Sequence, residues 1–549
     1  MRKTKIVATI GPSSKDKQIL KQLISAGVNV FRLNFSHSDH ESHQEIISVI
    51  KEASLEVGIE VAIMADLQGP KIRLGEFSEE NIILHTDDKF ILTTENIKGN
   101  RERASVSYKN LPSDVKVNDI LLINDGLVRL KVEKVENNEI HTVIKSGGLV
   151  ASRKGLNLPG VKISTPSLTE KDKDDLDFIL QQEVDFVAIS FIRTAEDLRE
   201  VKKIIHSSAQ DISIVAKIEK PEALADISNI VDETDVIMIA RGDLGVEIEP
   251  ERVPWVQKEI INECNKMGKP VIVATQMLES MIGNPQPTRA ETTDVANAIL
   301  DGADAVMLSG ETAMGKYPVA AVEMVVKIAN QTEKHYKKRS SSFFAQPEGI
   351  LHRISNSMTH AALMCAEDLD AAVIITITES GLTAEFMSKY RPEAPIIALT
   401  PSLKTLRKLL LSYNVFPFNI ERILDTDRIV DSALHIAEKG GFLKKNEIAV
   451  LTAGVPLGYV GTTNMIKVIN FEEKATGQSF TDEAEDDISK EHVLKVKLEL
   501  CNGCGLCVEE CAFDLLYIHN GKVRIKNSSL CAVDDFCINV CPTKALYRD

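Results

Sequence analysis

Long apolar runs and positive charge are both scarce in this chain of 549 residues. No run approaches the ~20 apolar residues that a membrane-spanning helix needs, and the apolar segment near Met1 is too short for a secretion signal. Lysine and arginine number 64 against 80 aspartate and glutamate, a formal net charge of -16. This negative balance argues against nucleic acid or a membrane as the main partner. We therefore expect a cytoplasmic protein of about three to five domains.

Cysteine is almost absent before residue 501. Cys264 and Cys365 stand alone in helical patterns and are predicted core residues, whereas the remainder of the nine cysteines lie between Cys501 and Cys541. Such a cluster is typical of a cofactor-binding module in a reducing compartment, and it argues against a disulfide framework.

Short β-branched runs alternate with helical patterns over the first part of the chain. The predicted strands are residues 5–10, 28–33, 60–67, 184–190, 212–219, 235–240, 270–275 and 303–309. Eight strands, each followed by a helix except where the third is interrupted, predict an α/β fold of the (β/α)8 barrel type. The interruption alternates apolar and polar residues, which predicts an inserted small β-barrel domain.

We predict five parts in the chain. The barrel takes residues 1–69 and 166–345, the inserted β domain 70–165, and a second α/β domain 346–470. Residues 471–492 are acidic with little apolar content and are predicted to be a mobile linker. Residues 493–549 hold the clustered cysteines.

Polar side chains end most of the predicted barrel strands, where barrels of this kind carry their chemistry. Lys217 and Glu219 close one strand, and their i, i+2 spacing points both to the same side. Asp243 closes the next strand, and a parallel crossover places it beside Glu219. Two such carboxylates predict a divalent metal site, although solvated strand-end acids remain an alternative.

Long motifs occur in order along the chain, among them TKIVATIGPSS, MADLQGPKIR, AKIEKPEAL, ARGDLGVE, PTRAETTDVANAI and DGADAVMLSGETAMGKYPV. Together they resemble the pyruvate kinases over residues 1 to about 470. The resemblance implies a glycolytic enzyme that transfers the phosphoryl group of phosphoenolpyruvate to ADP, giving pyruvate and ATP. It also implies a homotetramer.

The resemblance assigns roles residue by residue. Glu219 and Asp243 would hold Mg2+ or Mn2+, and Arg32 and Lys217 would neutralise the transferring phosphoryl group. The backbone of Gly242 and Asp243, with Thr275, would bind the substrate carboxylate. Thr275 and Ser309 would take part in protonation of the enolate. His37, Arg73 and Lys154 would contact the nucleotide.

One departure from the family concerns K+. Many members hold this ion near residues that match Asn34, Ser36 and Asp66, with a glutamate nearby. Here Lys71 stands in the glutamate position, and its tethered ammonium can replace the free cation. We predict activity that does not require K+. The alternative is that Lys71 is a solvated residue of the inserted domain.

The second α/β domain contains a loop that resembles the family's effector-phosphate loop. Thr378, Ser380 and Thr383 offer hydroxyl groups at the start of a helix, which predicts an anion site for a sugar phosphate or AMP. Leu382 stands where a basic residue is expected, so a helix cap without a ligand remains the alternative.

The cysteine segment reads Cys501-x2-Cys504-x2-Cys507-x3-Cys511, then Cys531-x5-Cys537-x3-Cys541-Pro542. This spacing is typical of iron–sulfur ligands, with zinc as the alternative. Residues 493–549 resemble a two-cluster bacterial ferredoxin, which implies a ferredoxin-like α+β fold.

The resemblance divides the ligands between two clusters. One [4Fe-4S] cluster would take Cys501, Cys504, Cys507 and Cys541. The other would take Cys511, Cys531 and Cys537, with Asp534 where a fourth cysteine is usual. A carboxylate is a harder ligand than a thiolate, so we predict a labile iron and interconversion of [4Fe-4S] and [3Fe-4S] forms. A local cap by Asp534 is the alternative.

Three functions remain open from the sequence. The first is an active pyruvate kinase whose tail senses redox state or exchanges electrons with a partner. The second is an electron carrier or docking module that uses the kinase as a scaffold. The third is an active kinase whose clusters are purely structural.

Overall fold

The computed structural model describes the chain except for residues 209, 336–349, 424, 457–462, 472–493, 510–515, 520, 526–535 and 549. It divides into two compact units, residues 1–471 and 472–549. The predicted acidic linker lies outside the described residues apart from Phe471.

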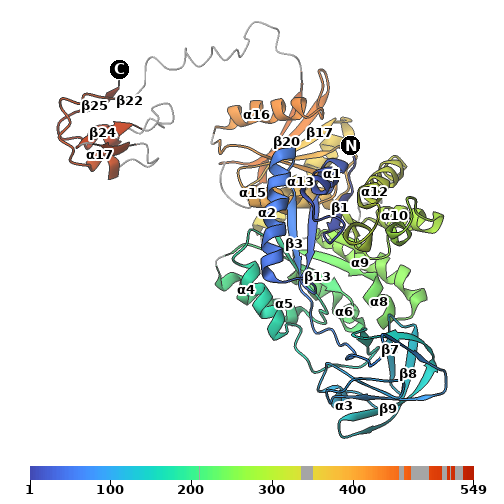
Figure 1. Cartoon of the computed structure of the whole chain (residues 1–549). Helices are drawn as coiled ribbons and strands as arrows, with labels where there is room; N and C mark the ends of the chain where they lie inside the picture. The colour runs from blue at the N-terminus through green and yellow to red at the C-terminus, as the bar shows by residue number, and fades with distance from the viewer. Residues whose placement is uncertain are drawn as a thin grey trace. The chain divides into compact units, whose positions relative to one another are not determined.

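The first unit contains a closed barrel of eight parallel strands, so the predicted barrel is confirmed (Figure 1). Around the barrel the strands follow the order β1-β16-β15-β14-β13-β12-β3-β2. Their bounds are β1 Lys5–Thr9, β2 Val30–Asn34, β3 Ala62–Asp66, β12 Phe186–Ile189, β13 Ser213–Ile218, β14 Val236–Ala240, β15 Val271–Ala274 and β16 Ala305–Leu308.

Helices cover the outside of the barrel, and their ends follow local sequence signals. Asp16 caps the first helix by accepting N–H bonds, and Gly27 ends it with a φ of 111° that glycine adopts without strain. The barrel helices are α1 Lys17–Ala26, α2 His40–Val57, α4 Glu170–Ile179, α5 Ala195–Ser207, α6 Pro221–Ala225, α7 Ile227–Glu233, α8 Arg241–Glu247, α9 Val253–Met267, α10 Arg289–Asp301, α11 Gly310–Ala313 and α12 Pro318–Glu333.

A helix begins at Pro221, and the structure breaks it into α6 and α7 at Asp226. The carboxylate of Asp226 accepts the N–H of Ala195, in the first turn of α5, at 2.8 Å. It also accepts from Asn229 at 2.6 Å. A contact with a neighbouring helix therefore decides this break, which periodicity within the segment does not reveal.

The interior of the barrel is filled by side chains from alternate strand positions. Val7, Met64, Phe186 and Met238 are among them, and all are fully buried. Leu406 of α15 (Leu403–Leu409), together with Leu410 and Leu411, belongs to the same cluster. The second α/β domain thus shares one core with the barrel.

Residues between β3 and β12 form a separate layer of strands with its own apolar core, in which all pairs are antiparallel except β5 with β6. A six-stranded sheet has the order β11-β7-β8-β9-β5-β6, and β10 pairs with β4. The bounds are β4 Asn81–Leu84, β5 Lys89–Thr93, β6 Arg103–Ser105, α3 Leu111–Asp114, β7 Ile120–Ile123, β8 Val128–Glu136, β9 Glu139–Ser146, β10 Gly148–Ala151 and β11 Leu156–Asn157. We call this segment, residues 70–165, the lid.

The second α/β domain has a five-stranded sheet of order β19-β18-β17-β20-β21, parallel except for the edge strand β21. This confirms the predicted α/β domain. Its elements are α13 Ile350–Asp368, β17 Val373–Ile377, α14 Leu382–Lys389, β18 Ile396–Thr400, α15, β19 Val415–Asn419, α16 Thr426–Lys439, β20 Ile448–Gly454 and β21 Thr463–Asn470.

The described part of the second unit is small. Two antiparallel pairs, β22 (Leu494–Val496) with β25 (Leu546–Arg548) and β23 (Leu516–His519) with β24 (Lys522–Ile525), accompany the short helices α17 (Leu506–Glu509) and α18 (Phe536–Asn539). Cys501, Cys507 and Cys537 lie within its apolar cluster.

No helix among the described residues is both long enough and apolar enough to cross a membrane.

A buried carboxyl at the start of β12 offers a test of the barrel. Asp185 accepts the N–H of Ile63 at 2.8 Å, and burial raises its pKa to about 6. Because the folded state holds this proton more tightly than the unfolded state, stability falls as the pH rises from about 4 to 6. Asp185→Asn keeps a carbonyl acceptor, so we expect it to gain about 1–2 kcal/mol at pH 7.5 and little at pH 4.5.

Differential scanning calorimetry at both pH values measures this gain as a shift in Tm. An equal Tm change at the two pH values would show that the charge of Asp185 carries no penalty. Asp177→Asn, at an exposed position on α4, is the control.

Candidate active site

The ammonium group of Lys217 lies among three side chains at the carboxyl rim of the barrel. It is 2.9 Å from Glu219 Oε1 and 3.2 Å from Asp66 Oδ1, and it donates to Ser190 Oγ at 2.7 Å. Burial alone would lower the pKa of Lys217, but the two carboxylates outweigh burial and raise it. Lys217 is therefore a fixed positive charge at this rim.

Arg32 is the second cation of this group. From β2 its Nε lies 2.6 Å from Asp66 Oδ2, and Nη1 donates to Thr9 Oγ1 at 3.1 Å. Burial would raise the pKa of Asp66, but Arg32 and Lys217 hold it below its ordinary value. One carboxylate thus positions both cations that the sequence proposed for the phosphoryl group.

Glu219 and Asp243 are close enough for their charges to interact. Burial raises the pKa of Glu219, the Lys217 ammonium opposes the rise, and the Asp243 carboxylate adds to it. The second oxygen of Glu219 accepts the N–H of Phe191 at 2.8 Å. Mg2+ and Mn2+ prefer oxygen ligands and would relieve the repulsion between the two acids. The pair therefore fits a divalent cation.

Helix α8 begins at this rim, and its first turn is tied to β15. The N–H of Gly242 donates to Thr275 Oγ1 at 2.8 Å, and that hydroxyl donates to the carbonyl of Ala274 at 2.6 Å. The sequence had assigned the Gly242 N–H to the substrate carboxylate. In this structure it is bound to Thr275, so a ligand would compete with that hydroxyl.

Two anchors of this region had been given no catalytic or binding role. Arg241 pairs with Asp294 of α10 at 2.8 Å. Glu311 is fully buried and accepts the N–H groups of Leu278 at 2.9 Å and Ser309 at 2.7 Å. Glu311 fixes the backbone at Ser309, one of the predicted catalytic residues. An acid on a helix gives no local signal of such a contact.

Asn34 ends β2, and the loop that follows carries Ser36 and His37 and is contacted by His43. His43 Nε2 lies 3.0 Å from the carbonyl of His37, and burial lowers the pKa of His43. The side chain of His37 is exposed. Asn34 closes a turn by accepting the N–H of Ser36 at 3.2 Å.

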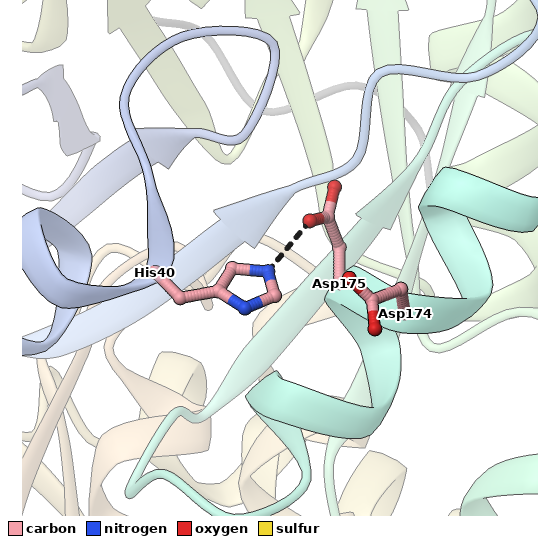
Figure 2. Close-up of side chains that lie close together, drawn as sticks. All are labelled: His40, Asp174 and Asp175. Carbon is pink, nitrogen blue, oxygen red and sulfur yellow. Dashed lines mark hydrogen bonds and ion pairs between the residues drawn. The ribbon is translucent and has the colours of Figure 1, made fainter.

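His40, Asp174 and Asp175 bring three ligand atoms within 4.8 Å of one another, the one such group in the described part of the chain (Figure 2). Both oxygens of Asp175 already have partners. Oδ1 lies 2.8 Å from His40 Nε2, and Oδ2 lies 2.5 Å from Lys171. Because the Lys171 ammonium fills the place of a cation, this cluster serves to hold the loop after β2 against α4.

The other predicted nucleotide contacts lie where the lid joins the barrel. Arg73 donates to the carbonyl of Arg153 at 3.2 Å, and the carbonyl of Lys154 accepts the N–H of Leu74 at 2.9 Å. The two chains that connect the lid therefore run side by side here, with Arg73 opposite Gly155.

The K+ prediction placed the ammonium of Lys71 in the position of the family's glutamate, and the structure shows which carboxylate this ammonium contacts. Its Nζ lies 3.5 Å from Asp243 Oδ1, whereas Asp66 is already shared by Arg32 and Lys217. The tethered ammonium is thus beside the metal-binding pair instead of beside Asp66.

The hydroxyls of the predicted effector loop are partly engaged within the protein. Thr378 Oγ1 accepts the N–H of Gly381 at 2.9 Å, and Thr383 bonds Thr463 at 2.6 Å. Ser380 is half-buried beside them. An open hollow of about 500 Å³ adjoins the loop, lined in part by the paired side chains of Glu379 and Arg422.

In the second unit three cysteines lie close enough to Cys507 to affect its pKa. Burial raises the pKa of Cys507, and the neighbouring groups of Cys541, Cys504 and Cys501 raise it further. Backbone N–H groups point at two of the sulfurs, from Val523 to Cys501 at 3.3 Å and from Ala545 to Cys541 at 3.2 Å.

The second predicted ligand set is mostly outside the described residues, namely Cys511, Cys531 and Asp534. Cys537 is described and buried.

Comparison with known proteins matches two family models to the first unit. The model described as the barrel domain of pyruvate kinase matches residues 1–322, and that of its alpha/beta domain matches residues 356–469. Pyruvate kinase of Clostridium acetobutylicum is 45% identical over 473 residues, covering 85% of this chain and 99% of that protein. That of Geobacillus stearothermophilus is 46% identical over 473 residues, covering 85% and 80%.

A solved structure shows the same fold. The crystal structure of a pyruvate kinase from Cryptosporidium parvum superposes with a TM-score of 0.79 at 38% identity, covering 85% of this chain and 96% of that one.

The carboxylate pair predicts divalent-cation binding by the purified protein. Glu219→Gln and Asp243→Asn should each weaken Mn2+ binding by at least about tenfold, since even ligand-supporting groups contribute that much. Electron paramagnetic resonance of free Mn2+ measures the dissociation constant directly. Glu249→Gln, at an exposed acid just beyond α8, is the matched control and should leave it unchanged. Unaltered binding in both site variants would place the metal elsewhere.

Proposed function

This chain belongs to the pyruvate kinase family, and on that premise we propose how its residues carry the phosphoryl group from phosphoenolpyruvate to ADP. The observation that supports the proposal is the Lys217 ammonium, 2.9 Å from Glu219 and beside Asp66 at the rim. Positive charge fixed next to a metal-binding pair suits a reaction that depends on positioning and charge neutralisation.

In the proposed mechanism, Arg32 and Lys217 bind the phosphoryl oxygens of phosphoenolpyruvate. The bond from phosphorus to the enol oxygen breaks while a terminal phosphate oxygen of ADP bonds to phosphorus. Glu219 and Asp243 would hold Mg2+ or Mn2+, which supplies Lewis-acid charge to the substrate oxygens. Arg73, Lys154 and His37 are proposed to contact the nucleotide; Arg73 and Lys154 lie at the lid junction and His37 lies on the loop after β2.

The enolate that remains takes a proton at its methylene carbon to become pyruvate. We assign Thr275 and Ser309 to the group that delivers it. The Thr275 hydroxyl donates to the Ala274 carbonyl in this structure, so it must turn away from that carbonyl to reach the substrate. Glu311 holds the backbone of Ser309 in place.

We further propose that this enzyme works without K+. The support is the Lys71 ammonium, which stands 3.5 Å from Asp243 and supplies a tethered monovalent charge at the site. A solvated role for Lys71 would leave the K+ requirement intact. Asn34, Ser36 and Asp66 would then form the region for the free ion.

The first assay is pyruvate formation from phosphoenolpyruvate, ADP and Mg2+ in K+-free buffer. We expect wild-type protein to keep at least about half its rate, and Lys71→Glu to require added K+. Lys162→Glu, at an exposed lysine of the lid, controls for the charge change. A large loss of wild-type rate without K+ would refute the ion independence, and no pyruvate with K+ present would refute the reaction itself.

An activating sugar phosphate or AMP at Thr378, Ser380 and Thr383 is also proposed. The adjoining hollow and the start of α14 support it. The internal bonds of Thr378 and Thr383 leave Ser380 as the most available hydroxyl. Activation that Ser380→Asp leaves unchanged would favour the alternative, a helix cap without a ligand.

For the tail we propose a ferredoxin-like domain with two iron–sulfur clusters, in a reducing cytoplasm. Three cysteines that interact with Cys507, and N–H groups that donate to the sulfurs of Cys501 and Cys541, support the first cluster, because such bonds tune and stabilise metal-bound thiolates. The second cluster, with Asp534, rests on the sequence. A redox role, in which the kinase stays active, is favoured over a scaffold role because Lys217, Arg32 and the acids are intact.

Anaerobic purification followed by metal analysis and electron paramagnetic resonance tests the clusters. We expect about eight irons or fewer per chain, one persistent [4Fe-4S] signal, and a [3Fe-4S] signal that appears on mild oxidation. Cys501→Ser should remove the persistent signal alone. Two four-iron clusters that oxidation leaves unchanged would refute the labile site, and zinc in place of iron would refute both clusters.

The same preparation separates the roles of the tail. Different rates of pyruvate formation with oxidised and reduced clusters would mean redox control, and truncation near residue 475 should then abolish the difference. Equal rates would favour electron transfer or a structural role.

A further inference from the structure

Three side chains from separate parts of the first unit meet in a buried contact that the mechanism above does not use. Glu247 Oε1, at the end of α8, lies 2.7 Å from the ammonium of Lys220 and accepts the side-chain N–H of Asn157 at 3.1 Å. The side chains of Lys220 and Glu247 are 7% and 1% exposed. We call this contact the latch.

The three residues of the latch belong to three different segments of the first unit. Lys220 follows Glu219 directly and is the N-cap residue before α6. Glu247 ends α8, whose first turn holds Gly242 and Asp243. Asn157 is on β11, the last strand of the lid sheet before the chain returns to the barrel. Strand β11 pairs with β7, so Asn157 moves with the lid sheet.

One further ion pair joins the lid to α8, and one turn of the lid lies near this helix. Lys71, on the outgoing connection of the lid, pairs with Asp243 in the first turn of α8. The turn between β7 and β8 packs near the last turn, where a side chain added at Gly126 would stand 3.9 Å from Val246. Figure 1 shows β7 and β8 beside α8. The outgoing connection of the lid therefore contacts the first turn of α8, and Asn157 on the returning side contacts its last residue.

The position of the buried Glu247 carboxylate depends on the two groups that contact it. Lys220 neutralises Glu247, and Asn157 adds a neutral donor to the same oxygen. The second oxygen, Oε2, is buried and has no hydrogen-bond partner among the described residues. Among the described residues, the Glu247 side chain is therefore positioned by Lys220 and by Asn157 of the lid. A displacement of the lid would act directly on the end of α8.

We propose that Asn157, Glu247 and Lys220 are positioning residues that couple closure of the lid to the placement of α8. When the lid closes, the hydrogen bond from Asn157 to Glu247 moves α8 with the lid. This movement positions the first turn of α8 next to the substrate carboxylate and Thr275. The inference rests on the proposed binding of phosphoenolpyruvate at this turn. Closure of a lid excludes water and completes the site, so loss of coupling lowers kcat more than it changes substrate affinity.

Asn157→Ala is the informative variant, because it removes one neutral donor and leaves the Lys220–Glu247 pair intact. We expect kcat to fall about tenfold while the KM for phosphoenolpyruvate stays within about threefold. Asn157→Asp should lower kcat further, since it places a like charge against Glu247. Asn138→Ala, at an exposed position in the β8–β9 turn of the lid, is the matched control and should behave as wild type.

Hydrogen–deuterium exchange on the full chain gives a readout that a merely structural role would not move. In wild type, phosphoenolpyruvate with Mn2+ should slow exchange both in residues 241–247 and in residues 154–158. In Asn157→Ala the ligand should slow exchange in α8 alone. Circular dichroism and Tm confirm that the variant is folded.

Two results would overturn the latch. One is wild-type kcat together with protection of both segments in Asn157→Ala. The other is a reduced kcat with both segments still protected together, which would assign Asn157 a local structural role. Failure of the proposed function looks different, because wild type itself would then form no pyruvate.

Discussion

Charges buried at the carboxyl rim of the barrel have to neutralise one another, and the site depends on how they do so. Asp66 is shared between Arg32 and Lys217, and Lys217 also contacts Glu219. Removing one partner from such a group leaves an uncompensated buried charge, which costs several kcal/mol. The network therefore fixes strands β2, β3 and β13 relative to one another at the point where substrate must bind.

Closure of the barrel makes this network possible. Residues 34 to more than 150 positions apart in the sequence reach one rim because parallel strands present the same end to it. The interior behind the rim is filled by apolar side chains, and leucines that follow β18 complete that core. The polar groups at the rim thus lie against a closely packed apolar core, and electrostatic interactions are strong in such surroundings.

In each of the two units, ionisable side chains lie close enough to one another to shift their pKa values. In the first unit Glu219 and Asp243 repel each other, and in the second burial and the neighbouring cysteines raise the pKa of Cys507. Hard oxygen pairs suit Mg2+ or Mn2+, and soft sulfur sets suit iron–sulfur clusters. Lys71 adds a further device in the first unit, a cation that is covalently part of the chain.

The sequence by itself determined the barrel, the second α/β domain and the residues at the strand ends, because β-branched runs and their polar ends are local patterns. Long-range contacts decided the rest. Asp226 accepts an N–H of the first turn of α5, and the helix after Pro221 is interrupted there. Thr275 accepts the N–H of Gly242, and Lys71 pairs with Asp243. The latch of Asn157, Glu247 and Lys220 has no local signature, since each residue alone resembles a solvated polar residue. Only the tertiary structure brings such side chains together, because a buried polar group finds its partner in space and not along the chain.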